Sequence, residues 1–474
     1  MSFELPDYLK MAKPNPMANR APWYKNTAPT YAGIFLWFVF WTGGTTCAAN
    51  VGGVLSHGIW APIVSLALAA LLCHAFYYVV LGLMGQKTGL PLYIVGTSTF
   101  GTSGGFIMPG FLMGVLQFGW LGVNIYFSAL AIFAIDPGTL GDKPVPFQAA
   151  IVMAGLGVLA AFMGLKGIQY VARVATYLPL IPLATLVVMF AATVGGLADF
   201  TPAKFMTLHK SAVPGAPDML TGFGLVAALT TFVVGFFATA GAAGVDFGTN
   251  SRDDRDVHMG GFVGIFVAIV FTAGLAMLIL AGASGKGFIT KEAFTLNPMV
   301  LIPTVLGEKL GKVVLVLLAI SAFPAACFSS FIAANSFRTT LSKVNPFVSV
   351  GIGAAVSIAL AISKLAGQLG SVFALIGASF GPICGAMAVD YMLNNCKWSG
   401  PRKGFNPAGW LAWAFGFGVG IMPNLGLDLP LAPVWAMIVG AVVYFLAAKA
   451  GLQSPTVPMA AAPSEERAAE LQAV

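Results

Sequence analysis

The chain has 474 residues, of which 58% are hydrophobic and only 9% are charged, and its formal net charge is +7 at pH 7. Its mean hydropathy of +0.87 is far above that of average soluble domains. This composition excludes an ordinary soluble domain and gives no reason to expect a nucleic-acid partner. It indicates a protein whose partner is the lipid bilayer.

Twelve segments of the chain are long and apolar enough to cross a bilayer, which takes about 20 mostly apolar residues. They are residues 30–54, 59–84, 106–134, 146–165, 168–196, 219–245, 259–284, 311–336, 347–363, 366–393, 408–424 and 431–451. With a cytoplasmic N-terminus, 16 of the 24 Lys and Arg residues lie on the cytoplasmic side, as the positive-inside rule requires. We therefore predict an all-α, multi-pass membrane protein with twelve transmembrane helices and both termini in the cytoplasm. Its ends, residues 1–29 and 452–474, are expected to be short and mobile, and residues 30–451 form the transmembrane domain.

Glycine clusters mark the first and sixth spans as interrupted helices. The first holds "FWTGGTTCAANVGG", and the sixth holds "VVGFFATAGAAGVDFG". Interrupted helices at matching places in two halves indicate an inverted-repeat transporter with a central site, although glycine also lets membrane helices pack closely. We predict a five-plus-five arrangement with repeats at 30–196 and 219–393 and two extra helices at 408–451. The residues expected to line the site from span one are Gly43, Gly44 and Thr45.

The third span carries three polar or amphipathic side chains on one face. Gln117, Trp120 and Asn124 are spaced i, i+3, i+7, which places them on the same side of a helix. An indole face can stack on a flat heterocycle, and each amide offers a donor and an acceptor. Phe236 and Phe237, expected at the interruption of span six, supply the opposite wall. The alternative is that both amides bond to other helices and only hold the bundle together.

Few ionisable groups occur in the spans. Asp246 and Asp390 lie at cytoplasmic ends, and we expect Asp246 to serve a cytoplasmic gate with Arg252 or Arg255 as its cation. His74 is interpreted as a packing histidine rather than a proton relay. Nothing resembles a catalytic constellation, a metal site or a selectivity filter, so we predict a carrier of a small uncharged polar molecule rather than an enzyme. The five cysteines lack metal-binding spacing.

Four stretches of the chain resemble the nucleobase:cation symporter-1 family, and within it the cytosine permeases most. They are "GQKTGLPLYIVGTSTFG", "QFGWLGVN", "VGFFATAGAAGVDF" and "FGPICGAMAVDYML". The resemblance implies a LeuT-type fold and secondary active transport of a nucleobase or related heterocycle, coupled to Na+ or H+ and without any other cofactor. It places the family's stacking Trp on Trp120, a substrate-binding Gln on Gln117, and the span-six aromatic on Phe237. Asn124 stands where some relatives have a Gln.

Span eight departs from the family pattern. In "ISAFPAACFSSF", Pro324 and Ala325 stand where sodium-dependent members have adjacent hydroxyls, and the family's substrate-binding Asn has no clear counterpart. A helix break at Pro324 would expose backbone carbonyls for an ion. We expect weak sodium coupling at most, with proton coupling at least as well supported. The remaining candidates for ion coupling are Thr42, Thr46, Ser321, Ser329 and Ser330.

The sequence thus predicts a monomeric carrier in the plasma or inner membrane that imports a cytosine- or purine-like heterocycle with a cation by alternating access. One alternative is a carrier of a thiamine-precursor pyrimidine or a hydantoin-like solute. The other is a non-coupled channel or sensor on the same scaffold, which would bind ligand without coupled counterflow.

Overall fold

The computed structural model describes residues 4–141, 143–341 and 343–459, which form helices and loops with two isolated β-bridges. The helices before the long loop near residue 220 are α1 Asp7–Lys10, η1 Met17–Asn19, η2 Trp23–Lys25, α2 Thr27–Leu36, α3 Phe38–Thr46, η3 Gly53–Leu55, α4 Trp60–Leu72, η4 Cys73–Val79, α5 Val80–Thr88, α6 Leu92–Val95, α7 Thr97–Phe100, η5 Phe106–Phe111, α8 Leu112–Ile132, α9 Pro137–Leu140, α10 Phe147–Lys166, α11 Ile168–Ala175, α12 Leu180–Thr193, η6 Val194–Asp199 and α13 Pro202–Ala212. Those after it are α14 Gly222–Ala242, α15 Gly244–Gly248, α16 Asp254–Gly261, η7 Phe262–Val267, α17 Ala268–Gly285, α18 Leu301–Leu306, α19 Glu308–Thr340, α20 Pro346–Ile362, η8 Leu365–Gly367, α21 Leu369–Leu393, α22 Pro407–Gly420, η9 Met422–Leu425 and α23 Ala432–Lys449.

Nine helical stretches of the described chain are long and apolar enough to cross a membrane. They are Trp60–Thr88, Phe106–Ile132, Phe147–Lys166, Ile168–Asp199, Gly222–Ala242, Asp254–Gly285, Glu308–Arg338, Leu369–Leu393 and Ala432–Lys449. The other three predicted spans coincide with the interrupted pair α2 and α3, with α20 of 17 residues, and with α22 of 14 residues. The all-α membrane class is therefore confirmed, and the number twelve stays a prediction.

Both predicted interruptions are present, but the first lies at a different residue. Span one breaks at Trp37, whose φ of −57° and ψ of 126° end α2 before α3 begins. The glycines Gly43 and Gly44 lie inside α3 instead. There the absence of a side chain lets α3 approach other helices closely. Span six is continuous as α14 up to Ala242, and a single residue, Ala243, separates it from α15.

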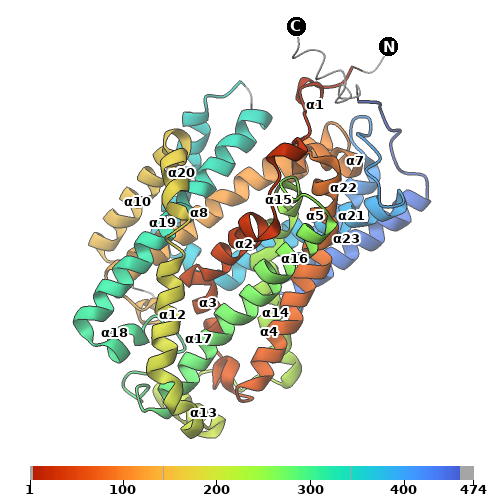
Figure 1. Cartoon of the computed structure of the whole chain (residues 1–474). Helices are drawn as coiled ribbons and strands as arrows, with labels where there is room; N and C mark the ends of the chain where they lie inside the picture. The colour runs from red at the N-terminus through yellow and green to blue at the C-terminus, as the bar shows by residue number, and fades with distance from the viewer. Residues whose placement is uncertain (1–3, 142, 342, 460–474) are drawn as a thin grey trace.

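The centre of the molecule is the region where α14 packs against α21 and α4, while α8 packs against α19, α20 and α10 (Figure 1). Gly235 makes the close approach of α14 to α21 possible, since a Cβ there would lie 2.6 Å from the backbone oxygen of Phe373. Helices α1 and α13 lie at opposite ends of the bundle (Figure 1). We call these the α1 end and the α13 end.

The described parts of both termini are packed, in contrast to the mobility expected for them. At the N-terminus, the Asn15 amide N–H donates to the Gly89 oxygen at 2.8 Å, and Arg20 Nη1 donates to the Gln86 oxygen at 2.6 Å. At the other terminus, the Ser454 amide donates to Asn406 Oδ1 at 2.9 Å. Composition alone missed this because polar segments are anchored here by loops far away in sequence. Residues 1–3 and 460–474 of the two predicted end segments lie outside the described residues.

A buried ionic network joins the late spans to the loop that precedes span three. Asp390 on α21 accepts hydrogen bonds from Ser98 Oγ at 2.6 Å, Thr99 Oγ1 at 3.2 Å and Tyr444 OH at 2.7 Å. The Arg402 guanidinium lies 3.4 Å from the same carboxylate. Both ionic side chains are more than nine-tenths buried, so each is the other's charge partner away from water.

Candidate functional site

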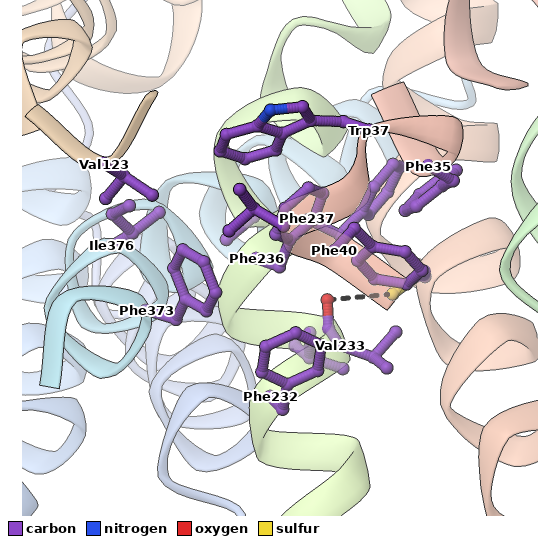
Figure 2. Packing of buried hydrophobic residues seen from close by; sticks show 14 of the residues in the cluster. Phe35, Trp37, Phe40, Val123, Phe232, Val233, Phe236, Phe237, Phe373 and Ile376 are labelled. Atoms are coloured by element: carbon purple, nitrogen blue, oxygen red, sulfur yellow. Dashed lines mark hydrogen bonds between the residues drawn. The ribbon is translucent and has the colours of Figure 1, made fainter. Parts of the chain in front are cut away.

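Four aromatic rings, three from helices and one from the α2–α3 junction, meet around the third span, and we call them the ring cluster: Trp37, Trp120, Phe236 and Phe373. Trp120 on α8 lies edge-on to Phe236 of α14, with ring centroids 5.0 Å apart. It also packs at 5.2 Å against Phe373 of α21 and at 6.1 Å against Trp37 at the α2–α3 junction. Figure 2 shows the rings of Trp37, Phe236 and Phe373 converging from three separate ribbons.

Trp120 is the least buried ring of this cluster. Trp37, Phe236 and Phe373 are 8%, 2% and 1% exposed, whereas Trp120 is only partly buried. No Asp, Glu, Lys or Arg occurs in α2, α3, α8 or α14, so the surroundings are uncharged. A flat, uncharged ring can therefore stack on Trp120 in an environment of low polarity.

Among the described residues, the two amides on α8 make hydrogen bonds only within that helix. Gln117 Nε2 lies 3.6 Å from Met113 Sδ, and Asn124 Nδ2 donates to the Trp120 backbone oxygen at 3.2 Å. Both contacts stay within α8, which weakens the interpretation of these amides as interhelical bonds. The Asn124 Oδ1 atom is buried with no partner among the described residues, as are Trp37 Nε1 and Thr42 Oγ1. Buried polar atoms without partners are uncommon in proteins and point to a missing ligand or water.

Phe236 and Phe237 do not lie at an interruption, as the sequence had suggested, because α14 is continuous through both. Only Phe236 reaches Trp120. Phe237 instead stacks on Phe35 at 5.8 Å and packs against Tyr31 at 5.7 Å. Successive residues on a helix point about 100° apart, so one of two adjacent phenylalanines faces the cluster and the other faces α2. The resemblance placed the stacking role on Phe237, whereas the contacts place Phe236 beside Trp120.

The predicted residues of span one serve mainly to pack helices. A Cβ on Gly43 would lie 2.5 Å from the Phe232 ring, and one on Gly44 would lie 3.2 Å from Ala273 Cβ. Thr45 donates within α3 to the Thr42 oxygen at 2.8 Å. Of these three residues, Gly43 lies against Phe232, whose ring in turn packs against Phe373 of the ring cluster at 5.4 Å.

The candidate ion-coupling hydroxyls lie on two helices, α3 and α19. Thr46 donates to the Thr42 oxygen within α3, whereas Ser321 donates to the Leu318 oxygen within α19 at 2.7 Å. Ser330 donates within α19 to the Ala326 oxygen, and its Cβ lies against Gly164 of α10. Ser329 is buried one position before it.

The predicted helix break at Pro324 is wrong. Helix α19 runs without interruption from Glu308 to Thr340, with Pro324 inside it. The expected opening that would expose backbone carbonyls to an ion is therefore absent from this described helix. A proline forfeits one backbone donor, but packing against α8 and α10 keeps the helix together.

Asp246 lies on α15, next to the loop that begins α6. Its Oδ1 accepts a hydrogen bond from the Leu92 amide at 2.8 Å. Burial raises the pKa of the Asp246 carboxyl to about 6, and the Leu92 bond opposes that rise. The expected partner Arg252 is engaged elsewhere, since its Nε lies 2.7 Å from Asp256 Oδ2. Among the described residues, Asp246 forms an ion pair with neither Arg252 nor Arg255, the two cations predicted for it, and accepts from a backbone N–H instead.

Sequence reasoning missed Trp37 and Phe373 as members of the ring cluster. Trp37 carried one usable signal, an indole N–H in an apolar span without an evident partner. Phe373 carried none, because many phenylalanines occur in the spans and only tertiary packing selects this one.

Comparison with known proteins adds three findings. The sequence profile of the family described as "Permease for cytosine/purines, uracil, thiamine, allantoin" matches residues 14–397. The cytosine permease of Escherichia coli (strain K12) is 28% identical over 249 residues, which cover 52% of this chain and 50% of that protein. The cytosine permease of Escherichia coli O6:H1 matches to the same extent. The match spans about half the length of these curated relatives.

Two solved structures are similar over nearly the whole chain. The inward-facing conformation of Mhp1 has a TM-score of 0.65 at 18% identity, covering 97% of this chain and all of that one. A closed conformation of Mhp1, titled a nucleobase-cation-symport-1 family transporter with bromovinylhydantoin bound, has a TM-score of 0.58 at 19% identity. The alignment covers 92% of this chain and 94% of that one. At these identities the likeness shows the fold alone, which is all-α and of the LeuT type.

Proposed function

Because the chain belongs to the family of permeases for cytosine/purines, uracil, thiamine and allantoin, we propose that it is a secondary active transporter importing a nucleobase-like planar heterocycle together with a cation. The observation that supports this most is the partly exposed ring of Trp120 among buried aromatic rings in uncharged spans. The similarity to cytosine permeases supports cytosine or a related base as the substrate of this chain. Alternating access follows from the LeuT-type fold.

The test begins with binding to the purified protein. A panel of pyrimidine and purine bases, a hydantoin and a thiamine-precursor pyrimidine is screened by thermal shift, because a ligand of the native state raises its apparent stability. We expect one base to stabilise the protein in a saturable manner. Counterflow in proteoliposomes then separates a carrier from a channel or sensor, since only a carrier exchanges labelled for unlabelled ligand. Binding without counterflow would contradict the proposal.

We also propose the arrangement in the membrane that the sequence predicts. Residues 30–196 and 219–393 form the two inverted repeats, 408–451 form two extra helices, and the protein is a monomer of the plasma or inner membrane. On this proposal the α1 end faces the cytoplasm, so that Asp246 belongs to the cytoplasmic gate. The distribution of Lys and Arg between the two sets of loops supports this orientation.

Sodium is expected to change uptake little. The hydroxyls of Thr46, Ser321 and Ser330 are bonded within their own helices, and Pro324 and Ala325 offer no side-chain oxygen. A hard cation prefers several oxygen ligands at once. Uptake is measured in sodium and in choline buffer at fixed pH, and then in choline with an imposed proton gradient. Steep, saturable activation by sodium that disappears in a Ser329→Ala/Ser330→Ala variant would contradict this expectation.

Asp246→Asn is expected to change transport rate with little change in ligand affinity. Above pH 6 the ionised carboxylate accepts the Leu92 bond most strongly and holds α15 to α6. As the pH falls through about 6 the group is protonated and this bond weakens, so the wild-type rate should rise through that range and the variant should lack the inflection. Rate and affinity are measured across pH 5–8, with the exposed Asp254→Asn as control. Equal losses of binding and transport in Asp246→Asn would show that the residue belongs to the pocket instead.

A further inference from the structure

The side chain of Trp37 occupies a special place at the interruption of span one. The backbone leaves the helical conformation at this residue and resumes it at Phe38. As a result the indole lies against two members of the ring cluster, with its centroid 6.1 Å from that of Trp120 and 6.2 Å from that of Phe236. Trp37 therefore borders the partly exposed ring on which a ligand would stack.

The indole N–H of Trp37 is buried and unpaired. Trp37 is 8% exposed, and its Nε1 has no hydrogen-bond partner among the described residues. In Figure 2 the nitrogen lies on the edge of the ring turned away from Phe40 and Phe236, so neither of these ring faces receives the N–H. Desolvating a donor without a partner is unfavourable, and a bound molecule that supplies an acceptor removes that penalty.

Other tryptophans of the described chain have a hydrogen-bond acceptor for the indole N–H. Trp41, Trp398 and Trp413 each donate to a backbone oxygen, at 3.2, 2.9 and 3.1 Å. Trp410 shares the unpaired state of Trp37, but it packs against Phe405, well outside the ring cluster. Trp410 is therefore a matched control for the loss of an unpaired indole N–H.

A second unpaired atom gives the complementary half of the recognition. Asn124 Nδ2 donates to the backbone oxygen of Trp120. Its Oδ1 remains a buried acceptor without a partner among the described residues, one helical turn beyond Trp120. Among the described residues, Trp37 Nε1 is thus a buried donor without a partner, and Asn124 Oδ1 is a buried acceptor without one. Ring nitrogens, ring N–H groups and carbonyl oxygens of nucleobase-like heterocycles present the matching acceptor and donor in a single plane.

We propose that Trp37 is a specificity-determining residue of this site, whose indole N–H donates to a ring nitrogen of the heterocycle stacked on Trp120. This inference rests on the proposed function and names the chemical feature that the substrate must carry. A heterocycle of the same shape with CH in place of that acceptor leaves the N–H unpaired and binds more weakly.

The test compares ligand pairs that differ in one acceptor. Purified wild-type protein, Trp37→Phe and Trp410→Phe are titrated calorimetrically with the best base of the panel and with its deaza analogues, in which each ring nitrogen in turn is replaced by CH. We expect wild type and Trp410→Phe to bind the base roughly tenfold more tightly than one deaza analogue, the scale of one buried hydrogen bond. Trp37→Phe should bind the two alike, with the affinity for that analogue nearly unchanged.

Three controls keep the outcomes distinct. Thermal unfolding without ligand verifies that each variant is folded. If Trp37→Phe does not fold, Trp37→Met is used as a second replacement that lacks the indole donor. Undiminished discrimination in the folded donor-free variant would overturn the role of Trp37 while leaving the proposed function in place. A folded wild-type protein that binds no base of the panel would overturn the proposed function itself.

Discussion

Trp120→Ala is expected to weaken ligand binding by roughly 30- to 1000-fold, equivalent to about 2–4 kcal/mol, which is the range for aromatic residues at the centre of a binding site. Trp120 is the least buried ring of the cluster, and its loss removes both the stacking surface and the apolar area that a flat ligand would bury. Membrane abundance should stay near normal, because Trp120 is only partly buried. Binding to purified protein and uptake into proteoliposomes are measured together with the amount of folded protein.

The neighbouring phenylalanines provide a matched pair for this experiment. Phe236 and Phe237 are adjacent, of equal volume and fully or nearly fully buried, so each alanine substitution should destabilise the protein by about 3–5 kcal/mol. Only Phe236 contacts Trp120, and only Phe236→Ala should also weaken binding per folded molecule. Retention of full specific activity by Trp120→Ala with poor expression would show that Trp120 is a packing residue.

Asp390→Ala is expected to destabilise the protein strongly, although Asp390 lies outside the ring cluster. It leaves the Arg402 guanidinium buried without its charge partner and removes the acceptor of Ser98 and Tyr444. Breaking a buried ion pair in this way costs about 3–5 kcal/mol. The thermal unfolding of detergent-solubilised protein measures the effect, and little folded protein should be recovered.

The control for Asp390 is an exposed ion pair at the same end of the molecule. Lys87 Nζ lies 3.2 Å from Asp254 Oδ2, and both side chains are about half exposed. Such surface pairs contribute about 0–1 kcal/mol, so Asp254→Ala should leave unfolding nearly unchanged. A double replacement, Asp390→Leu with Arg402→Met, should recover part of the loss because no unpaired charge remains. Equal stability of Asp390→Ala and Asp254→Ala would contradict the structural role of the network.

Hydropathy and helical periodicity account for the features that the sequence predicted correctly. The spans follow from the length of apolar segments. The shared face of Gln117, Trp120 and Asn124 follows from the spacing of side chains on a helix, which no tertiary contact has to determine. These local rules placed the ring of Trp120 correctly on an uncharged helix.

Features that depend on contacts between helices were not accessible in this way. The break in span one occurs at Trp37, while the glycines that suggested it, Gly43 and Gly44, serve close packing. Which of Phe236 and Phe237 meets Trp120 depends on the rotation of α14 about its axis, and neighbours in sequence carry no information about that rotation. The packed N-terminal segment was missed because its hydrogen-bond partners, such as Gly89, belong to other loops.

The Asp390 network also constrains the order of events during synthesis. Ser98 and its partner Asp390 are 292 positions apart, and Tyr444 follows later still. At roughly 5–20 residues per second, the ribosome needs about 15–60 s to synthesise the chain from Ser98 to Asp390. Throughout that interval the hydroxyls of Ser98 and Thr99 lack the carboxylate to which they donate in the finished protein. The loop before span three therefore emerges early but reaches its final conformation only after the last helices have been inserted, and that delay is a window for quality-control proteases and chaperones to act on the nascent carrier.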